Sequence, residues 1–542
     1  MSCGLWFGLV VFGFLPDPPT PGTSQPTSFR GEVVDADTGR PIPCRVSIRG
    51  EDGSWHFPEP ASSEGSVVPY RKRAIGNPAI VEMHATLSAH PFTVRLPAGR
   101  YTVTAERGKE YRAERREVTV GAGPVELTLR LRRWIDMAER GWYSGDTHTH
   151  RTLAELPNVM LAEDLNVAFP LLDWVREAFV APIGRREASF RDPGPDPIRI
   201  DATHRIVPRN TEYEIFTVGK AGHTLGAFFV LGHRTPLELG VPPVGSVAAR
   251  AHREGALIEL DKHNWPWSMA LVPIMPVDLY ELSNNHVWQT DFAFREFGEA
   301  PAAWMGVERD EKGFTERGWI EFGFRNYYAL LDCGFRLRPT AGTASGVHPV
   351  PLGFGRVYIR LDGGLDERAW LRGLDAGRSF VTTGPMLLVT LDGHDPGHRF
   401  EPAAAEARAY RLRGSAIGAM PLARIEVVIN GEVARTIRPV NRETGRAYES
   451  PIDEVLTLDG TSWVAVRCFE DRPDGRVRFA HSGPFHVDVA ARPLRPRRAE
   501  VEYLVHRVQG QIDRSADVLP RPALDEYRRA LGIYRKLLET AR

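Results

Sequence analysis

The sequence has few of the features that mark several common protein classes. Only four cysteines occur in 542 residues, and none of them form a CxxC pair, which argues against a disulfide framework or a cysteine-rich zinc module. After residue 15 no apolar run is long enough to cross a bilayer. Basic and acidic residues number 68 and 69 without a strong block of either sign, so nothing indicates charge-driven binding of nucleic acid.

Several short catalytic motifs are also missing. The chain contains no Walker loop, no GxGxxG turn and no HExxH pair, which excludes the usual nucleotide-binding signatures and the HExxH metalloproteases. The segment Gly342–Gly346 is not a GxSxG nucleophile elbow, because its serine stands one place too late. No internal repeat of fixed period is present. The chemistry therefore has to be sought in other residues.

The N-terminus contains one short apolar run. Residues Leu5–Leu15 are apolar over 11 positions, which is too short for a transmembrane helix but suits the central part of a secretory signal peptide. A stretch rich in Pro, Ser and Thr follows as far as Thr27, although no basic residue precedes the run. Residues 1–27 are therefore expected to be a signal peptide for export to the periplasm or the exterior, the alternative being a disordered leader.

Length and pattern predict several domains. A chain of 542 residues that is 42% hydrophobic suits a soluble protein of three or four domains. Residues 28–132 show short alternating strands separated by Gly/Pro turns, which predict a β-sandwich. The segments GEVVDADTGRPIPCRVSI and FTVRLPAGRYTVTAERG resemble the carboxypeptidase-regulatory-like domain. Residues 53–90 are expected to form a long polar insertion within it.

The pattern of predicted secondary structure changes twice after residue 132. Residues 133–380 alternate short apolar strands with helical patterns, which predicts an α/β domain with a mostly parallel sheet or barrel. Residues 381–490 predict β structure, with a hairpin turn at Asn430-Gly431. Residues 491–542 predict a helical tail with one apolar face, formed first by Val501, Leu504, Val505 and Val508.

Two histidines stand close together where the α/β pattern begins. His148 and His150 follow the apparent strand that starts at Trp142, and residues two apart on a strand point to the same side. Neutral imidazoles suit zinc, iron or manganese. Such pairs also occur on surfaces and in cores, but their position at a strand end, where catalytic groups collect in α/β barrels, favours a metal site.

The surrounding motifs resemble a known family. GWYSGDTHTH is similar to the first motif of the polymerase-and-histidinol-phosphatase (PHP) metallohydrolases, and the rest of the region resembles their CehA/McbA branch. The later matches are LAEDLNVAFPLLD, NTEYE, GHTLGAFFVLG, LIELDKHNWPW and DLYELSNN. This resemblance, over roughly residues 134–540, implies a distorted β/α barrel followed by a β-domain. Together with the N-terminal sandwich, it predicts a barrel flanked by N- and C-terminal β-sandwich domains. It also implies two or three metal ions and hydrolysis of a phosphoester, ester or amide.

The same resemblance suggests site residues. The implied metal ligands are His148, His150, Glu155, Glu212, His223 and His263. Glu214 competes with Glu212 for its place, and Glu281 is a candidate for supporting the ligands. Asp173 or Asp261 could act as general base. Each carboxylate could instead be an ordinary surface group, and each histidine a core residue.

Two departures from the family pattern reduce the expected number of ions. The family usually has Thr-Asp-His where this chain reads Leu172-Asp173-Trp174, so a histidine is absent. Where a Gly-Ser-Asp-x-His motif is usual, Ala344 and Gly346 stand in place of ligands, and His348 lies two residues on. A complete three-metal site is therefore not expected. One or two divalent ions (Zn, Mn or Fe), or a degenerate site, remain.

Two functions follow from the sequence. The first is a metal-dependent hydrolase that cleaves a phosphoester or a carboxyl or carbamoyl ester or amide in a small-molecule or polymer substrate. The second is a non-catalytic, exported binding protein built on a degenerate PHP scaffold, which the missing ligands and the flanking β-domains would suit. The oligomeric state cannot be derived from the sequence.

Overall fold

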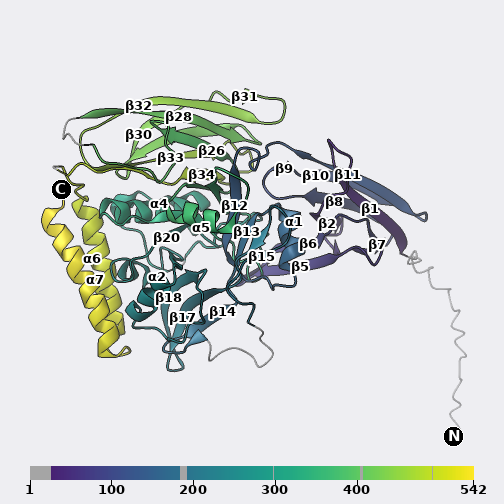
Figure 1. Cartoon of the computed structure of the whole chain (residues 1–542). Helices are drawn as coiled ribbons and strands as arrows, with labels where there is room; N and C mark the ends of the chain where they lie inside the picture. Colours follow the sequence, from purple (N-terminus) through teal and green to yellow (C-terminus); the bar gives the residue numbers. More distant parts are fainter. Residues whose placement is uncertain (1–25, 183–191, 297, 403–406, 491) are drawn as a thin grey trace, which may run out of the picture.

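The computed structural model describes residues 26–182, 192–296, 298–402, 407–490 and 492–542. Figure 1 shows N-terminal sheets, a central α/β part, C-terminal sheets above it and a pair of helices along one side. The chain is therefore a multidomain, strand-rich α/β protein, as predicted. The expected signal peptide or leader lies almost wholly outside the described residues. Within the described ranges no helix is long and apolar enough to cross a membrane.

Two sheets form the N-terminal part and share one apolar cluster, which includes Phe29, Val46 and Leu129. These short strands agree with the β pattern of residues 28–132. One sheet has the order β4 (Glu59–Pro60), β7 (Phe92–Leu96), β1 (Thr27–Asp35), β11 (Val125–Arg133) and β9 (Tyr111–Arg112). The other has the order β10 (Glu114–Val120), β8 (Gly99–Glu106), β2 (Cys44–Gly50), β6 (Asn77–Leu87) and β5 (Val67–Ala74), with β3 (Trp55–His56) beside β2.

The stretch expected to be a polar insertion contains the antiparallel hairpin β5–β6, which reaches the α/β part. The hydroxyl of Tyr70 donates to the carbonyl of His348 at 2.5 Å and accepts the Gly346 N–H at 2.9 Å. The guanidinium of Arg151 lies over the Tyr70 ring, 3.8 Å from its centroid. The insertion therefore packs against a loop of the central part.

The central part has two hydrogen-bonded sheets. One has the order β14 (Asp173–Glu177), β17 (Asn210–Val218), β18 (Ala221–Leu231), β19 (Leu257–Leu260), β20 (Leu279–Ser283) and β23 (Arg338–Ala341). The other begins β15 (Ile198–Arg199), β16 (Arg205–Ile206), β13 (Val167–Pro170), β12 (Trp142–Thr149), β24 (Arg356–Arg360) and β25 (Ser379–Thr382). Among the described strands, hydrogen bonds do not close these sheets into one ring.

The expectation of a mostly parallel sheet was wrong, because both sheets are mixed. β12 is parallel to β13 but antiparallel to β24. β17 and β18 are antiparallel because only Gly219 and Lys220 connect them, and both have positive φ, 54° and 70°. A two-residue connection of this kind makes a hairpin, whereas a parallel pair needs a crossover of a dozen residues or more.

Helices cover the central sheets where the sequence predicted them. The helical patterns expected within residues 133–380 correspond to α1 (Leu156–Glu163), α2 (Gly245–Arg253) and α4 (Glu316–Asp332). The remaining short elements are α3 (Ser268–Leu271), α5 (Glu367–Asp375), a 3-10 turn (Ala303–Met305), β21 (Arg309–Asp310) and β22 (Gly313–Phe314). Thr315 and Asp366 cap α4 and α5 with side-chain hydrogen bonds, which fixes where these helices begin.

The C-terminal sheets are continuous with the central part. The second central sheet runs on from β25 into β34 (Phe479–Ser482), β33 (Ser462–Glu470), β29 (Leu422–Ile429) and β30 (Glu432–Ile437), with β27 (Arg399–Phe400) and β35 (Phe485–Val487) at its side. A further sheet contains β26 (Met386–Leu391), β28 (Arg408–Gly418), β32 (Tyr448–Leu458) and β31 (Arg442–Glu443). The predicted boundary after residue 380 therefore falls inside a strand. The hairpin turn at Asn430-Gly431 is confirmed, with φ of 48° and 78°.

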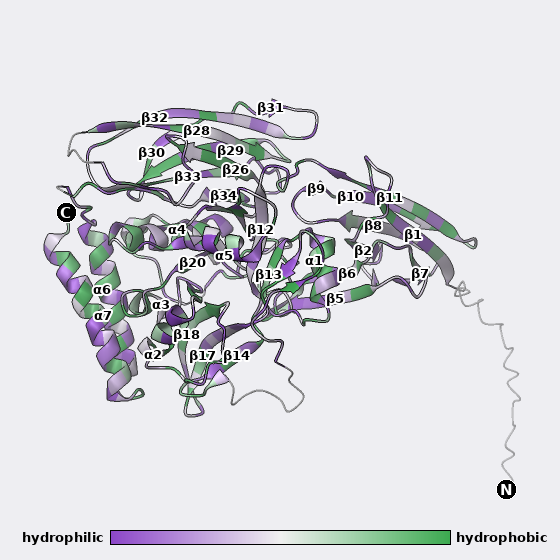
Figure 2. Cartoon of the chain, in the orientation of Figure 1, coloured by the Kyte–Doolittle hydropathy of each residue, from purple (hydrophilic) through white to green (hydrophobic). Residues whose placement is uncertain are grey.

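The helical tail packs on the central part through α6 (Arg498–Ser515) and α7 (Arg521–Thr540). Figure 2 shows hydrophobic and hydrophilic residues alternating along both helices, as helices with one buried face require. The Glu526 carboxylate accepts the N–H groups of Val244 and Gly245 at the start of α2. The tail thus satisfies backbone donors of the α/β part as well as burying its apolar faces.

Candidate metal centre

Strand β12 carries His148 near its end, and His150 is the first residue after it. Its irregular end is held by Asp146, whose carboxylate accepts the backbone N–H groups of His148 at 3.0 Å and Thr343 at 3.2 Å. The same carboxylate accepts the Gly353 N–H at 2.9 Å and the Thr343 hydroxyl at 2.5 Å. Four hydrogen bonds to one buried carboxylate fix the backbone that presents His148.

His148, His150 and Glu212 form a buried group of three potential ligands. Nε2 of His150 lies 3.2 Å from one oxygen of Glu212, and Nε2 of His148 lies 3.9 Å from the other. Ligand atoms about 2.1 Å from a tetrahedral ion are about 3.4 Å apart, so this spacing suits one ion. Nε2 of His148 and Oε2 of Glu212 have no hydrogen-bond partner despite being buried. Buried atoms of this kind, which can bind a metal and have no hydrogen-bond partner, fit a site for a divalent cation.

Glu281 orients His148 from the other side of the ring. One oxygen of Glu281 lies 3.0 Å from Nδ1 of His148, so the other nitrogen is left toward Glu212. Asp261 lies 3.9 Å from the same Nδ1. A carboxylate that fixes the tautomer and the angle of a ligand imidazole is the usual support for a metal-bound histidine.

The charges of this group also favour a cation. Burial raises the pKa of Glu212 to about 8, with a further contribution from Asp261. Burial lowers the pKa of His150 to about 4 and that of His148 well below its usual value. Both imidazoles are therefore neutral at neutral pH, as metal ligands must be, while Glu212 keeps a proton that a divalent ion would displace.

Lys262 places a positive charge beside the second half of the cluster. Its ammonium is hydrogen-bonded to Asp261 and lies 3.5 Å from Glu214. Burial would raise the pKa of Asp261, but Lys262 and His148 hold it below its usual range. The group formed by Glu212, Glu214 and Asp261 also has the spacing of a metal site. The single charge of the Lys262 ammonium is already shared between two of these three carboxylates.

The loop that lacks the expected ligands has a supporting role. A Cβ on Gly342 would lie 2.1 Å from Oε1 of Glu281 and 2.2 Å from Cβ of His148, so only glycine allows these side chains to approach. Thr343 bonds Asp146, as described above. The carbonyl of Ser345 accepts the N–H of His150 at 2.8 Å. This segment therefore positions the two histidines through its backbone instead of supplying ligands.

An aromatic cavity of about 450 Å³ lies beside the metal centre. Trp174 stands where the family has a histidine, and its ring packs on His150 with 4.8 Å between centroids. Its indole nitrogen donates to Glu214 at 3.2 Å. The other aromatic walls are Phe216, Trp265, Trp288 and Phe294, and polar groups are contributed by Arg176, Glu214, Lys262, His286 and His348. Ile75 of the β5–β6 hairpin completes the lining.

The structure does not bring Glu155 and His223 to the site. Glu155 lies at the start of α1, where its carboxylate and backbone exchange hydrogen bonds with Thr152. His223 is half-buried near the other end of β18, and its Nε2 lies 3.1 Å from the Ser515 hydroxyl. The residue of β18 that packs on His148 is Phe229, six positions further on, which corresponds to about 20 Å of strand.

Asp173 and His263 also lie apart from the ligand groups. Asp173 precedes Trp174 on β14, and since neighbouring strand residues face opposite sides, Trp174 faces His150 and Asp173 faces away. His263 follows the end of β19 and packs against Trp319 and Phe322 of α4, with ring centroids 4.8 Å away in both cases. Neither joins His148 or Glu212 in a group with metal-ligand spacing.

Two charged residues of the site were missed by sequence reasoning. Glu259 is fully buried, and its Oε1 accepts the hydroxyls of Thr147 at 2.9 Å and Thr340 at 2.5 Å. Lys262 is the second. A signal was present, because Glu259, Asp261 and Lys262 interrupt or directly follow an apolar strand whose other residues predict complete burial.

Comparison with known proteins does not identify a family for this chain. No protein-family model and no curated protein matches the chain. One similar crystal structure is a two-domain protein from Bacteroides vulgatus containing a predicted PHP-like metal-dependent phosphoesterase, with 10% identity, a TM-score of 0.31 and coverage of 63% of this chain and 95% of that one. Another is a β-glucuronidase from Parabacteroides merdae, with 10% identity, a TM-score of 0.16 and coverage of 83% and 62%. Neither likeness is close enough to support an inference about fold or activity.

Proposed function

We propose that this protein is a metal-dependent hydrolase whose ion is held by His148, His150 and Glu212. The observation that carries the proposal is that potential ligand atoms of these three side chains lie within metal-ligand spacing of one another, while Nε2 of His148 and Oε2 of Glu212 are buried without a hydrogen-bond partner. The resemblance of the surrounding sequence to PHP metallohydrolases supports the same chemistry. A divalent ion bound there would polarise the scissile group and make a water molecule nucleophilic near neutral pH.

The neighbouring residues of the chain have separate tasks in this proposal. Glu281 holds His148 in one tautomer. Burial raises the pKa of Glu214 to about 7, with Lys262 opposing and Glu212 adding to the rise. A carboxyl group with this pKa at the cavity wall suits proton transfer near neutral pH better than Asp261, which stays ionised beside Lys262. The Lys262 ammonium lines the cavity and would stabilise negative charge on the substrate.

One ion is proposed instead of two or three. The carboxylates that could hold a second ion, Asp261 and Glu214, already surround the ammonium of Lys262. A second divalent cation close to that ammonium would be repelled in a site with little water. The substrate is proposed to be an ester or amide, carboxyl or carbamoyl, with an apolar group, because five Trp and Phe side chains line the cavity; a phosphoester is the alternative.

Elemental analysis combined with a substrate panel tests this proposal. Purified protein is expected to contain about one equivalent of zinc, manganese or iron per chain and to hydrolyse at least one substrate among p-nitrophenyl phosphate, p-nitrophenyl acetate and an aryl carbamate. Chelation should abolish turnover, and the same metal should restore it. Protein that binds no divalent ion and hydrolyses none of the panel would contradict the proposal.

Metal affinity should depend on pH in a defined direction. Because burial raises the pKa of Glu212 to about 8, metal binding below that pH must first displace a proton. The affinity should therefore rise about tenfold per pH unit from pH 6 to 8 and then level off, since one proton is exchanged. Competition with a chelating dye, corrected for the dye's own protonation, measures this slope. Glu155→Gln, which changes a carboxylate outside the site, should leave the slope unchanged, and a flat wild-type profile would refute the assignment.

A further inference from the structure

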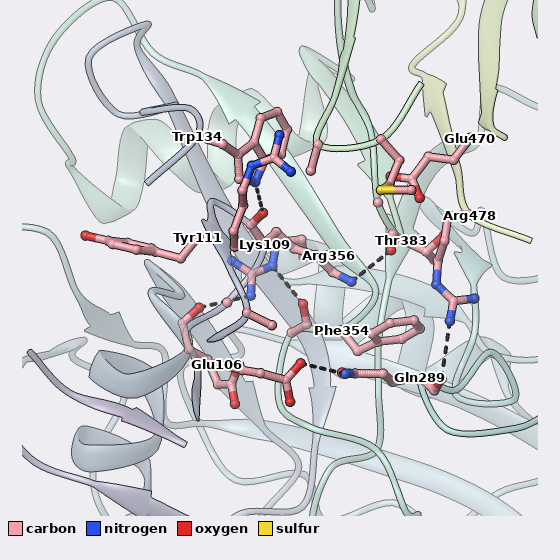
Figure 3. Close-up of a pocket in the computed structure, with 18 of the residues that line it drawn as sticks. Glu106, Lys109, Tyr111, Trp134, Gln289, Phe354, Arg356, Thr383, Glu470 and Arg478 are labelled. Atoms are coloured by element: carbon pink, nitrogen blue, oxygen red, sulfur yellow. Dashed lines mark hydrogen bonds between the residues drawn. The ribbon is translucent and has the colours of Figure 1, made fainter. Parts of the chain in front are cut away.

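A second cavity of about 550 Å³ lies where the N-terminal, central and C-terminal parts meet (Figure 3). Lys109 enters it from the chain after β8, Arg356 from the start of β24, and Arg478 from the residue before β34. No residue lines both this cavity and the aromatic cavity at the metal centre. The hydrolase proposed above makes no use of it.

The walls of this cavity carry more positive than negative side chains. Six residues are lysine or arginine and three are glutamate. All three glutamates already have partners: Glu163 and Glu106 lie 2.6 and 3.0 Å from Arg45, and Glu470 lies 3.2 Å from Arg472. The acidic groups of the wall therefore leave the other four cations uncompensated.

Neither Lys109 nor Arg356 forms an ion pair with a described carboxylate, and their charged groups donate mainly to backbone carbonyls. The Lys109 ammonium donates to Thr383 at 2.8 Å, and no described carboxylate lies within ion-pairing distance of it. The Arg356 guanidinium is fully buried and donates to the carbonyls of Gly353, Asp164 and Glu163 at 2.7, 3.2 and 3.1 Å. Two cations are thus held in low-dielectric surroundings without a counter-charge, which is costly unless one is supplied.

Arg478 is nearly as poorly compensated. It donates to the carbonyls of Val477 and Gln289, and the nearest carboxylate, Glu316, lies 3.5 Å away. Glu316 is closer to Arg476, at 2.8 Å. Burial lowers the pKa of Arg478 to about 10 in spite of Glu316. The positive charge of this guanidinium is therefore only partly matched, because Glu316 is shared with Arg476.

The cations are fixed in place before any ligand arrives. The Lys109 ammonium lies 3.7 Å from the centroid of the Phe354 ring, and the Arg478 guanidinium lies 4.9 Å from it. Figure 3 shows Phe354 among Lys109, Arg356 and Arg478. Burial and the repulsion of these two arginines lower the pKa of Lys109 well below its usual value. An anion between the three groups would relieve this repulsion without a rearrangement of the side chains.

We propose that this cavity is a binding site for a phosphate-type oxyanion, either free or carried by a small organic molecule. The three cations and the exposed rim residue Arg112 supply donors from three parts of the chain, and arginine in particular matches the geometry of an oxyanion. The volume lies within the range of small-ligand sites and exceeds what one inorganic phosphate fills. Occupancy would join the three parts of the molecule and so stabilise their arrangement.

Calorimetric titration with inorganic phosphate and with glycerol phosphate tests the site. The metal-site variant His148→Ala/His150→Ala is titrated beside the wild type, so that binding to a metal ion is separated from binding to the cavity. Saturable binding should persist in that variant, and the melting temperature should rise with ligand concentration. Tighter binding of glycerol phosphate would indicate an organic phosphate, and equal affinities would indicate the free ion.

Variants of the cavity decide whether it is responsible. Lys109→Met is expected to weaken binding about tenfold or more, since one charge-assisted contact is lost, while Lys109→Arg should stay within about threefold. Arg112→Met, at the exposed rim, should weaken binding about threefold without risk to the fold, and the distant surface variant Lys536→Met should have no effect. No saturable binding in the metal-site variant, or unchanged affinity in both Lys109→Met and Arg112→Met, overturns the proposal.

Discussion

Replacing His148 with alanine is expected to remove the bound metal and to lower turnover more than about 100-fold. A residue that only orients a metal ligand is worth about 10–100-fold, so the loss of a ligand should exceed that range. His148 is also the shared member of two of the three groups with metal-ligand spacing, so no neighbouring imidazole can take its place. Metal content by elemental analysis and kcat/KM on whichever substrate is hydrolysed measure the effect.

His223→Ala is the matched control for this experiment. The sequence motif implies both histidines as ligands, but His223 contacts Ser515 of α6 and lies far along β18 from the metal centre. Its variant should keep about one equivalent of metal and near-wild-type activity. Equal losses of metal in the two variants, or a full metal complement in His148→Ala, would show that the ligand set is wrong.

Arg45→Met is expected to destabilise the protein by about 3–5 kcal/mol. The Arg45 guanidinium joins the N-terminal sheets to the central part, since it donates to both oxygens of Glu163 at 2.7 and 2.6 Å and lies 3.0 Å from Glu106. Its side chain is only 6% exposed and that of Glu163 only 2%. Without Arg45 the carboxylate of Glu163 would stay buried with no cation of its own, and the part-buried Glu106 would lose its ion pair. Urea unfolding monitored by fluorescence and circular dichroism measures the change.

Two further variants separate charge from packing. Adding Glu163→Gln to Arg45→Met removes the stranded charge, so the double variant should be more stable than Arg45→Met alone. Arg100→Met breaks an ion pair with Glu51 whose side chains are 71% and 62% exposed, and it should destabilise the protein far less than Arg45→Met does. The assignment fails if Arg45→Met costs no more than Arg100→Met.

The part of the site that could be predicted from the sequence is the part governed by short-range geometry. His148 lies near the end of one strand with His150 directly after that strand, and Glu212 and Glu214 are two apart on another, so the members of each pair point to the same side wherever the strand lies. The strands and the three central helices were likewise visible in the local pattern. The Asn430-Gly431 turn was predicted because only a few dipeptides adopt its backbone conformation readily.

The failures depend on long-range geometry. Asp173 was a candidate base because it matches the Asp of the Thr-Asp-His motif of the resembling family, but the pairing of β14 with β17 turns Trp174 toward the site. His263 follows the end of β19, and the course of the chain there is set by packing against α4. The sheet is mixed because the two-residue turn at Gly219 and Lys220 makes β17 and β18 antiparallel. This turn predicts a hairpin only when both flanking segments are already known to be strands. Lys262 was overlooked because its role in the site depends on the carboxylates that surround it in the folded protein.

The hairpin β5–β6 contributes to the wall of the aromatic cavity from a stretch of the chain outside the central part. Tyr70 secures it to the loop at Gly346 and His348, and Ile75 at its turn lines the aromatic cavity, whereas every proposed metal ligand belongs to the central part. Exposed turns accept insertions and substitutions more readily than buried strands. Under the proposed function, a substitution at Ile75 would alter this part of the cavity wall and leave the three proposed metal ligands unchanged. A fragment that begins at residue 133 would lack this part of the wall.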